Sequence, residues 1–243
     1  MKKINKLLLM SGIATLLIFF NACINDEDKD SYGISKITFL PELNLVDEGK
    51  IYVVEKSVTF VEPGYAAFAG TDDITDAVTV KGTVDVNTAG MYLLEYIAVN
   101  PEGFSTTKTR NVFVADLNNP FAGDLSGAYT SSIVRVAGSA SSSRGPYTVY
   151  LDKLAEGLYH VEDFLGGWYW VGSAYGTAYA YDGIILVHSD GSIDMKWSNT
   201  AVGWGDGARL YSPAYDAANS TFTWGAQMLD ATTYIFNVTL VKQ

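Results

Sequence analysis

The sequence predicts an all-β protein in two parts, a small antiparallel β-sandwich followed by an antiparallel β-barrel or curved β-sandwich. Helical periodicity is nearly absent along the chain. Runs of β-branched and aromatic residues recur between Gly, Asn and Asp turns, which is typical of short strands. The two parts also differ in composition. All five tryptophans and eleven of the sixteen tyrosines follow a turn-rich polar stretch at 116–120, where we place the boundary.

The first 22 residues are expected to form a signal peptide. Three lysines precede an apolar or small run from Leu7 to Phe20, and Ala22 stands before Cys23. This run is about 14 residues long, short of the roughly 20 that a membrane-spanning helix needs. The pattern resembles a bacterial lipoprotein signal of the relaxed kind found in Bacteroidetes, which implies lipidation of Cys23. The alternative is an ordinary signal peptide that leaves a free thiol.

An acidic tether follows the predicted lipidation site, over residues 23–33. Its run of Asp and Glu resembles the export signal that sends Bacteroidetes lipoproteins to the outer face of the outer membrane. The same composition also describes a plain flexible spacer. Either way, we expect the chain to contact the membrane through its lipid anchor only.

The overall charge excludes several partners. The formal net charge is −11, and removal of the three signal-peptide lysines makes it −14. A chain this acidic repels nucleic acid and anionic lipid. With Cys23 the only cysteine, no disulfide is expected, so each domain has to be stabilised by its own core.

The first domain is expected over residues 34–116, with about seven short strands. Met91 to Val99 alternates as a strand should, and Asn100 to Gly103 is a turn with proline in its second position. The other expected strands are 34–40, 51–54, 57–61, 77–86 (a pair around Lys81-Gly82) and 104–115. Seven strands in about 80 residues are typical of an Ig-like β-sandwich.

This domain resembles a bacterial Ig-like domain common in Bacteroidetes surface lipoproteins. The likeness is carried by 71–78, 84–92 and 109–114, with Tyr96 and Gly103, and departs from the family at 99–102. It implies a spacer without activity of its own. The carboxylates of Asp72, Asp73 and Asp76 are either a calcium site or a solvated turn, and their spacing is not that of an EF-hand.

The second domain is expected over residues 117–243. Strands are predicted at 128–136, 147–151, 158–163, 184–188, 193–197, 220–224 and 232–241, with a mobile loop at 138–145 and a hairpin turn at 189–192. Alternation also predicts that Trp168 and Trp170 share one face of a strand. Tyr159, Gly166-Gly167, Tyr175-Gly176, Tyr179 and Asp190-Gly191 resemble an uncharacterised C-terminal domain of lipoproteins found near Sus-type glycan-uptake systems.

The aromatic residues of this domain either fill its core or bind a ligand. Exposed aromatic faces suit sugar rings, whereas buried ones supply core area. The long Gly-rich segment 199–215 is the best ligand candidate, because long ordered loops tend to be functional. The predicted ligand-binding residues are Trp204, Asp206, Arg209, Tyr211, Tyr215, Trp168 and Trp170.

No catalytic or cofactor motif is recognisable. His160 and His188 lack a neighbour at metal-ligand spacing, and neither a nucleophile elbow nor a phosphate-binding loop occurs. We therefore expect no enzyme, no cofactor and no metal. The sequence predicts a non-catalytic surface lipoprotein that binds extracellular glycan as an accessory to nutrient uptake, with outer-membrane uptake proteins as further partners. The alternative is a structural or adhesive subunit that binds partner outer-membrane proteins.

Overall fold

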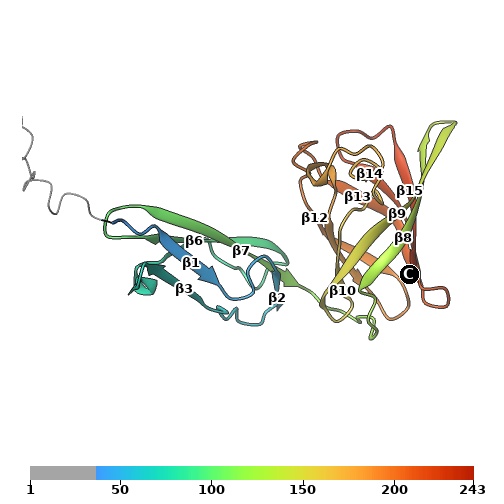
Figure 1. The fold of residues 1–243 in the computed structure, drawn as a ribbon. Helices are drawn as coiled ribbons and strands as arrows, with labels where there is room; N and C mark the ends of the chain where they lie inside the picture. Colours follow the sequence, from blue (N-terminus) through green and yellow to red (C-terminus); the bar gives the residue numbers. More distant parts are fainter. Residues whose placement is uncertain (1–36) are drawn as a thin grey trace, which may run out of the picture. The chain divides into compact units, whose positions relative to one another are not determined.

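The structure is a computed structural model that describes residues 37–243 (Figure 1). The predicted signal peptide, Cys23 and the acidic tether lie outside the described residues. Every regular element of the described part is a β-strand except two single 3-10 turns, η2 (Thr75–Ala77) and η3 (Thr177–Tyr179), so the all-β prediction is confirmed. No helix within 37–243 is long and apolar enough to cross a lipid bilayer.

The N-terminal domain is a sandwich of two sheets. One sheet has the order β1-β3-β4 and the other the order β2-β7-β6-β5, in which β2 pairs parallel to β7 and the remaining pairs are antiparallel. Leu43, Ala67, Leu94, Tyr96 and Val112 are buried between the sheets. The strands are β1 (Pro41–Leu45), β2 (Ile51–Glu55), β3 (Tyr65–Ala69), β4 (Asp72–Asp73), β5 (Thr79–Lys81), β6 (Gly90–Val99) and β7 (Ser105–Ala115).

A buried arginine holds the N-terminal sandwich together. The guanidinium of Arg110 donates to the carbonyls of Val46 (2.9 Å) and Gly64 (3.1 Å) and pairs with Glu62 at 3.2 Å. The Glu62 carboxylate also accepts a hydrogen bond from the Tyr96 hydroxyl. Burial raises the pKa of Tyr96 to about 12, with the Glu62 bond adding to the effect, so this hydroxyl stays protonated.

Three expectations for this domain are wrong. Residues 37–40 are not a strand, since pairing begins at Pro41, and residues 57–61 run without ladder partners. Only Thr79–Lys81 of the expected pair at 77–86 is a strand, because Gly82 turns the chain away. A Cβ on Gly82 would lie 2.4 Å from the Leu93 carbonyl oxygen, which explains why glycine is required there.

The C-terminal domain is an eight-stranded antiparallel sheet that curls into a nearly closed barrel (Figure 1). Its order is β12-β11-β10-β9-β8-β15-β14-β13, and the two edge strands approach each other through a bridge between Ser192 and Ala214. The strands are β8 (Gly127–Ala137), β9 (Ala140–Ala155), β10 (Leu158–Val161), β11 (Gly183–Val187), β12 (Ile193–Ser198), β13 (Ala208–Asp216), β14 (Thr221–Met228) and β15 (Ile235–Lys242).

The long loops of the barrel gather at one end, which we call the loop end. Because every neighbouring pair is antiparallel, the connections after β8, β10, β12 and β14 meet at the same end. Two of them are long, the segments 162–182 and 199–207, and they lie at the upper end of this domain in Figure 1. The opposite end carries short turns, including the expected hairpin turn at 189–192.

The barrel interior is a packed aromatic core, and the segment 163–168 enters it as a plug. The indole N–H of Trp224 donates to the Phe164 carbonyl at 2.8 Å, and the Ser131 hydroxyl donates to the Gly166 carbonyl at 2.8 Å. Gly166 has φ +68°, and a Cβ there would lie 2.5 Å from Ser131 Oγ. The buried aromatic residues of this core are Tyr129, Tyr159, Phe164, Trp168, Tyr181, Tyr215, Phe222, Trp224 and Phe236.

Three expectations for the second domain are wrong. The segment 166–172 is a series of turns and not a strand, so Trp168 and Trp170 do not share a strand face. The predicted mobile loop at 138–145 is mostly ladder, because β9 begins at Ala140 and leaves only a tight turn after β8. The segment 199–215 is a loop only as far as Gly207, after which β13 pairs with β14.

Candidate functional site

Four aromatic rings pack together at the loop end. Tyr169, Tyr175 and Tyr179 come from the segment 162–182, and Trp204 comes from the segment 199–207. Ring centroids are 4.9 Å apart for Tyr169 and Trp204, 5.1 Å for Tyr179 and Trp204, and 5.2 Å for Tyr175 and Tyr179. Tyr175 is exposed and the other three are half-buried. We call these four residues the aromatic cluster.

A cavity of about 290 Å³ adjoins the aromatic cluster. Tyr169 and Trp204 line it together with Asp206, Met228, Asp230, Ala231 and Tyr234. Asp206 is buried and already bonded, since it accepts hydrogen bonds from the Tyr181 hydroxyl and from the Asp230 backbone N–H. The indole N–H of Trp204 has no acceptor among the described residues. The cavity wall therefore combines apolar rings with the carboxyl groups of Asp206 and Asp230, as small-molecule sites combine an apolar lining with a few polar groups.

Asp163 positions the segment that carries three of the four rings. Its carboxylate is fully buried and accepts backbone N–H bonds from Leu165 (3.0 Å), Gly167 (2.8 Å) and Tyr181 (3.0 Å). These bonds tie the two ends of the segment to one side chain, so the rings between them are presented from a fixed base. Burial raises the pKa of Asp163 to about 6, opposed by the three N–H bonds.

The structure brings some of the predicted ligand residues together and separates others. Trp204 and Asp206 lie side by side in the cavity wall. Trp168 is buried beneath the loop end with its ring against Phe236, at a centroid distance of 5.5 Å, so it packs as core. Trp170 belongs to the same segment and is half-buried.

The remaining predicted residues lie elsewhere on β13. Arg209 and Tyr211 are on the outer face of the barrel, where the Tyr211 hydroxyl donates to Gln227 at 2.6 Å. Tyr215 is buried near the opposite end of the barrel, against Phe121 and Phe222. A bulge between Tyr211 and Ala214 reverses which residues face inward, which places Tyr215 in the core.

Sequence reasoning missed four ring-bearing positions of this site. Tyr169, Tyr175, Tyr179 and Tyr234 were not among the predicted ligand residues. Tyr175 stands in a Tyr-rich stretch next to Gly176, and aromatic residues beside glycine in a long loop are the signal that marks it. Tyr234 lies just before β15, and only the strand order shows that it faces the same end.

The described residues contain no group of three or more His, Cys, Asp or Glu arranged to hold a metal ion. Asp72, Asp73 and Asp76 are exposed, and Asp73 accepts the backbone N–H of Thr75 at 2.9 Å. Asp73 therefore caps a turn, and Asp72 and Asp76 are exposed beside it. The Thr75 hydroxyl, together with this backbone bond, lowers the pKa of Asp73.

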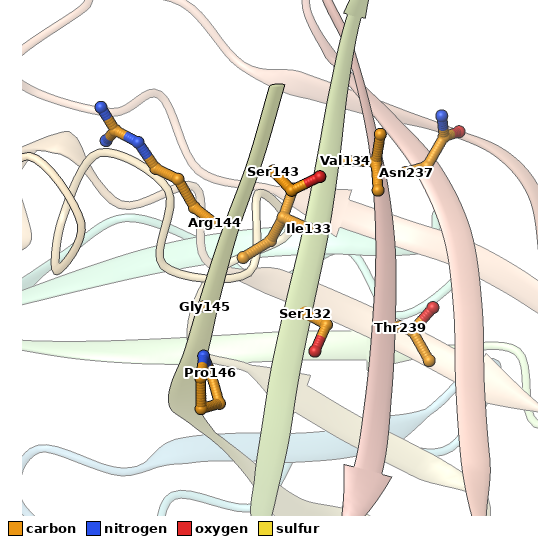
Figure 2. A pocket seen from close by; sticks show the side chains of 9 residues that line it. All are labelled: Ser132, Ile133, Val134, Ser143, Arg144, Gly145, Pro146, Asn237 and Thr239. Atoms are coloured by element: carbon orange, nitrogen blue, oxygen red, sulfur yellow. The ribbon is translucent and has the colours of Figure 1, made fainter. Parts of the chain in front are cut away.

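A second feature lies on the outer surface of the barrel. Apart from Asp152 at the far end of β9, the outward-facing residues of β8, β9 and β15 form a face without charged side chains, composed of Thr130, Ser132, Val134, Ser143, Thr148, Tyr150, Ile235, Asn237, Thr239 and Val241. We call it the uncharged face. A hollow of about 460 Å³ lies there, lined by Ser132, Val134, Asn237 and Thr239 together with Arg144 and Pro146. Figure 2 shows these side chains.

Comparison with known proteins identifies the family. Residues 46–114 match a family model for a bacterial surface protein Ig-like domain, and residues 118–242, just over half of the chain, match a family model for a C-terminal domain. The crystal structure of the lipoprotein BT2262 from Bacteroides thetaiotaomicron is 35% identical, over 84% of this chain and 100% of that chain, with a TM-score of 0.48.

The chain belongs to the BT2262-like family of bacterial surface lipoproteins. The Ig-like prediction for the first domain is confirmed by the family model. No curated protein matches the chain. The BT2262-like family therefore identifies the kind of protein, while the ligand has to be argued from the loop end itself.

Proposed function

We propose that this BT2262-like protein is a non-catalytic lipoprotein that binds extracellular glycan at the loop end of its barrel. The observation that carries the proposal is the aromatic cluster, in which Tyr175 is exposed and three half-buried rings surround it. A ring needed only for packing would be covered, as Trp168 and Tyr215 are in the same domain.

The chemistry of the loop end suits a sugar ring. The C–H face of a pyranose packs on flat aromatic surfaces, and its hydroxyls need both donors and acceptors close to that surface. The exposed Asp230 carboxylate supplies an acceptor on the wall of the cavity that Tyr169 and Trp204 line.

The proposed location follows from the N-terminal pattern. Acylation of Cys23 would anchor the protein in the outer membrane, with residues 23–33 as the tether and the domain over 34–116 as a spacer. The domain over 117–243 would then be available outside the cell, where glycan is captured for a neighbouring uptake system.

A matched pair of substitutions tests the glycan site. Tyr175 at the loop end is 53% exposed and Tyr150 on the uncharged face is 50% exposed, so replacement of either by leucine should leave the fold intact. Titration calorimetry of the mature chain against plant and host oligosaccharides should find a ligand, and Tyr175→Leu should weaken it about tenfold, or ~1.4 kcal/mol. Tyr150→Leu should change it less than about twofold. Equal effects of the two, or no ligand in a broad panel, would contradict the proposal.

The uncharged face favours a second candidate function, that of a structural or adhesive subunit. In a chain of net charge −11, an outer face with no charged side chain and with Val134, Tyr150, Ile235 and Val241 exposed suits a protein partner. Cross-linking in the native outer membrane should then capture an uptake protein through Tyr150 and not through Tyr175. Capture that is unaffected by Tyr150→Glu would exclude this face.

A further inference from the structure

A pair of arginines at the loop end faces the barrel interior. On β8, Tyr129, Ser131 and Ile133 face the barrel interior and are buried. Arg135 is the next inward-facing residue, at the loop end, and it pairs with the buried Phe236 of β15. Arg144 of β9 pairs with Ile133 and so faces the same way. Both arginines are half-buried. Inward-facing cations at the end of an aromatic core require an explanation.

The two guanidinium groups pack on aromatic rings instead of pairing with carboxylates. The Arg135 Cζ lies 4.8 Å from the Trp168 ring centroid and 4.6 Å from that of Tyr234, while the Arg144 Cζ lies 4.5 Å from Trp168. Arg144 also donates to the Trp168 carbonyl at 2.9 Å and to the Ser173 hydroxyl at 2.7 Å. These contacts fix the orientation of both planes.

Neither arginine forms an ion pair with an acidic residue of the described chain. Within residues 37–243, Arg135 makes no hydrogen bond either, so its five N–H donors are uncommitted. The buried Arg110 of the N-terminal domain, by contrast, is paired with Glu62. In a protein with 27 acidic and 16 basic residues, an oriented arginine without an acidic partner is a ready site for an external anion.

The arginine site is continuous with the proposed glycan site. Arg135 lines a hollow of about 330 Å³ together with Ser141, Ser142 and Tyr234. Tyr234 also lines the cavity beside Trp204, so the two hollows share one aromatic wall. A ligand that spans them meets a cation at one side and the Asp230 carboxylate at the other.

We propose that the glycan bound at the loop end is an anionic saccharide, whose carboxylate or sulfate group pairs with Arg135. This inference rests on the proposed glycan function and specifies its substrate class. The planar guanidinium offers a bidentate pair to either acidic group, while sugar hydroxyls of an adjacent residue donate to Asp230. A neutral sugar would leave the donors of Arg135 to water.

The test compares acidic and neutral sugars of the same length. Calorimetry on the mature chain uses tetragalacturonate, its carboxyl-reduced neutral counterpart, and a chondroitin sulfate tetrasaccharide with its desulfated form. We expect at least one acidic tetrasaccharide to bind about tenfold or more tightly than its matched control, and the gap to shrink as salt rises. Comparison of the tetragalacturonate pair with the chondroitin sulfate pair shows whether a carboxylate or a sulfate group is preferred.

Three variants assign the effect. Arg135→Gln should abolish the preference for the acidic sugar, and Arg135→Lys should retain only part of it, because an ammonium cannot pair bidentately. Lys153→Gln removes the same charge from the opposite end of the barrel and should change binding less than about twofold. Tryptophan fluorescence during urea unfolding verifies that each variant is folded.

The outcomes separate the two proposals. Equal binding of acidic and neutral sugars by the wild-type chain, or equal losses in Arg135→Gln and Lys153→Gln, would overturn the acidic-sugar inference while the glycan function stands. Binding of none of these sugars, together with no ligand in the wider panel, would overturn both.

Discussion

Replacement of Asp163 by asparagine tests how the loop end is held in place. Asparagine can keep one carbonyl oxygen toward the N–H groups of Leu165 and Tyr181, but it puts an amide donor where the second carboxylate oxygen accepts from Gly167 at 2.8 Å. One buried hydrogen bond is lost, and the Gly167 N–H and the new amide N–H face each other without an acceptor. This change costs about 2–3 kcal/mol.

The pH dependence of this cost has a definite sign. Burial raises the pKa of Asp163 from its ordinary value of 3.8 to about 6, so the folded state binds the proton more tightly than the unfolded chain. The resulting stabilisation is fully present below 3.8 and is lost as pH rises through 6. Between pH 4 and pH 7.5 the wild-type chain therefore loses roughly 2.5 kcal/mol through this group, whereas asparagine loses none.

The assay is urea unfolding followed by tryptophan fluorescence, which reports this domain alone because all five tryptophans lie in it. We expect Asp163→Asn to be less stable than wild type by about 2–3 kcal/mol at pH 7.5, where the wild-type side chain is the carboxylate, and by roughly 2.5 kcal/mol more than that at pH 4. Differences between the two proteins cancel the titration of other groups. A gap that stays constant or widens as pH rises would refute the reasoning, since it would mean that the buried carboxylate is favoured as the anion.

Three further changes probe other features. Arg110→Met should destabilise the N-terminal domain by about 3–5 kcal/mol, because it leaves Glu62 without its partner and two carbonyls without donors, and hydrogen exchange of the β6–β7 amides should rise accordingly. Gly166→Ala should cost about 2–4 kcal/mol in urea unfolding, since its φ is +68° and its Cβ would meet Ser131, and an unchanged midpoint would contradict the plug. Cys23→Ser should move the protein from the membrane fraction to the soluble fraction and abolish labelling with radioactive palmitate in a Bacteroidetes host.

The strands that sequence reasoning placed well are those whose signals are local. β8 was expected at 128–136 and is Gly127–Ala137, because its alternating apolar residues and flanking turn residues all lie within eleven positions. The expected strand carrying Trp168 and Trp170 does not form, because the interactions that replace it come from distant parts of the chain. Asp163 draws three N–H groups, one of them from Tyr181, into a turn that no window around Trp168 can show.

For the same reason, only part of the candidate site could be predicted from the sequence. Trp204 and Asp206 stand in a Gly-rich loop, which marked them in the sequence. Their partners Tyr169 and Tyr175 come about 30 residues earlier, and only the strand order places both loops at one end. Tyr215 was wrongly predicted to bind ligand. Its inward direction depends on how β13 pairs with β14 and on the bulge in β13, and the sequence of β13 alone shows neither.

The segment 162–182 has a consequence for how this protein can change. Its first part fills the barrel, with Asp163, Phe164 and Trp168 almost completely covered, whereas the part around Tyr175 is exposed at the mouth. Mutations in the first part alter folding and are removed by selection, while those in the second alter ligand contacts at little structural penalty. Homologues should therefore diverge in sugar preference through residues 169–179, and the same window is where a library should be randomised to redirect the protein toward a new saccharide.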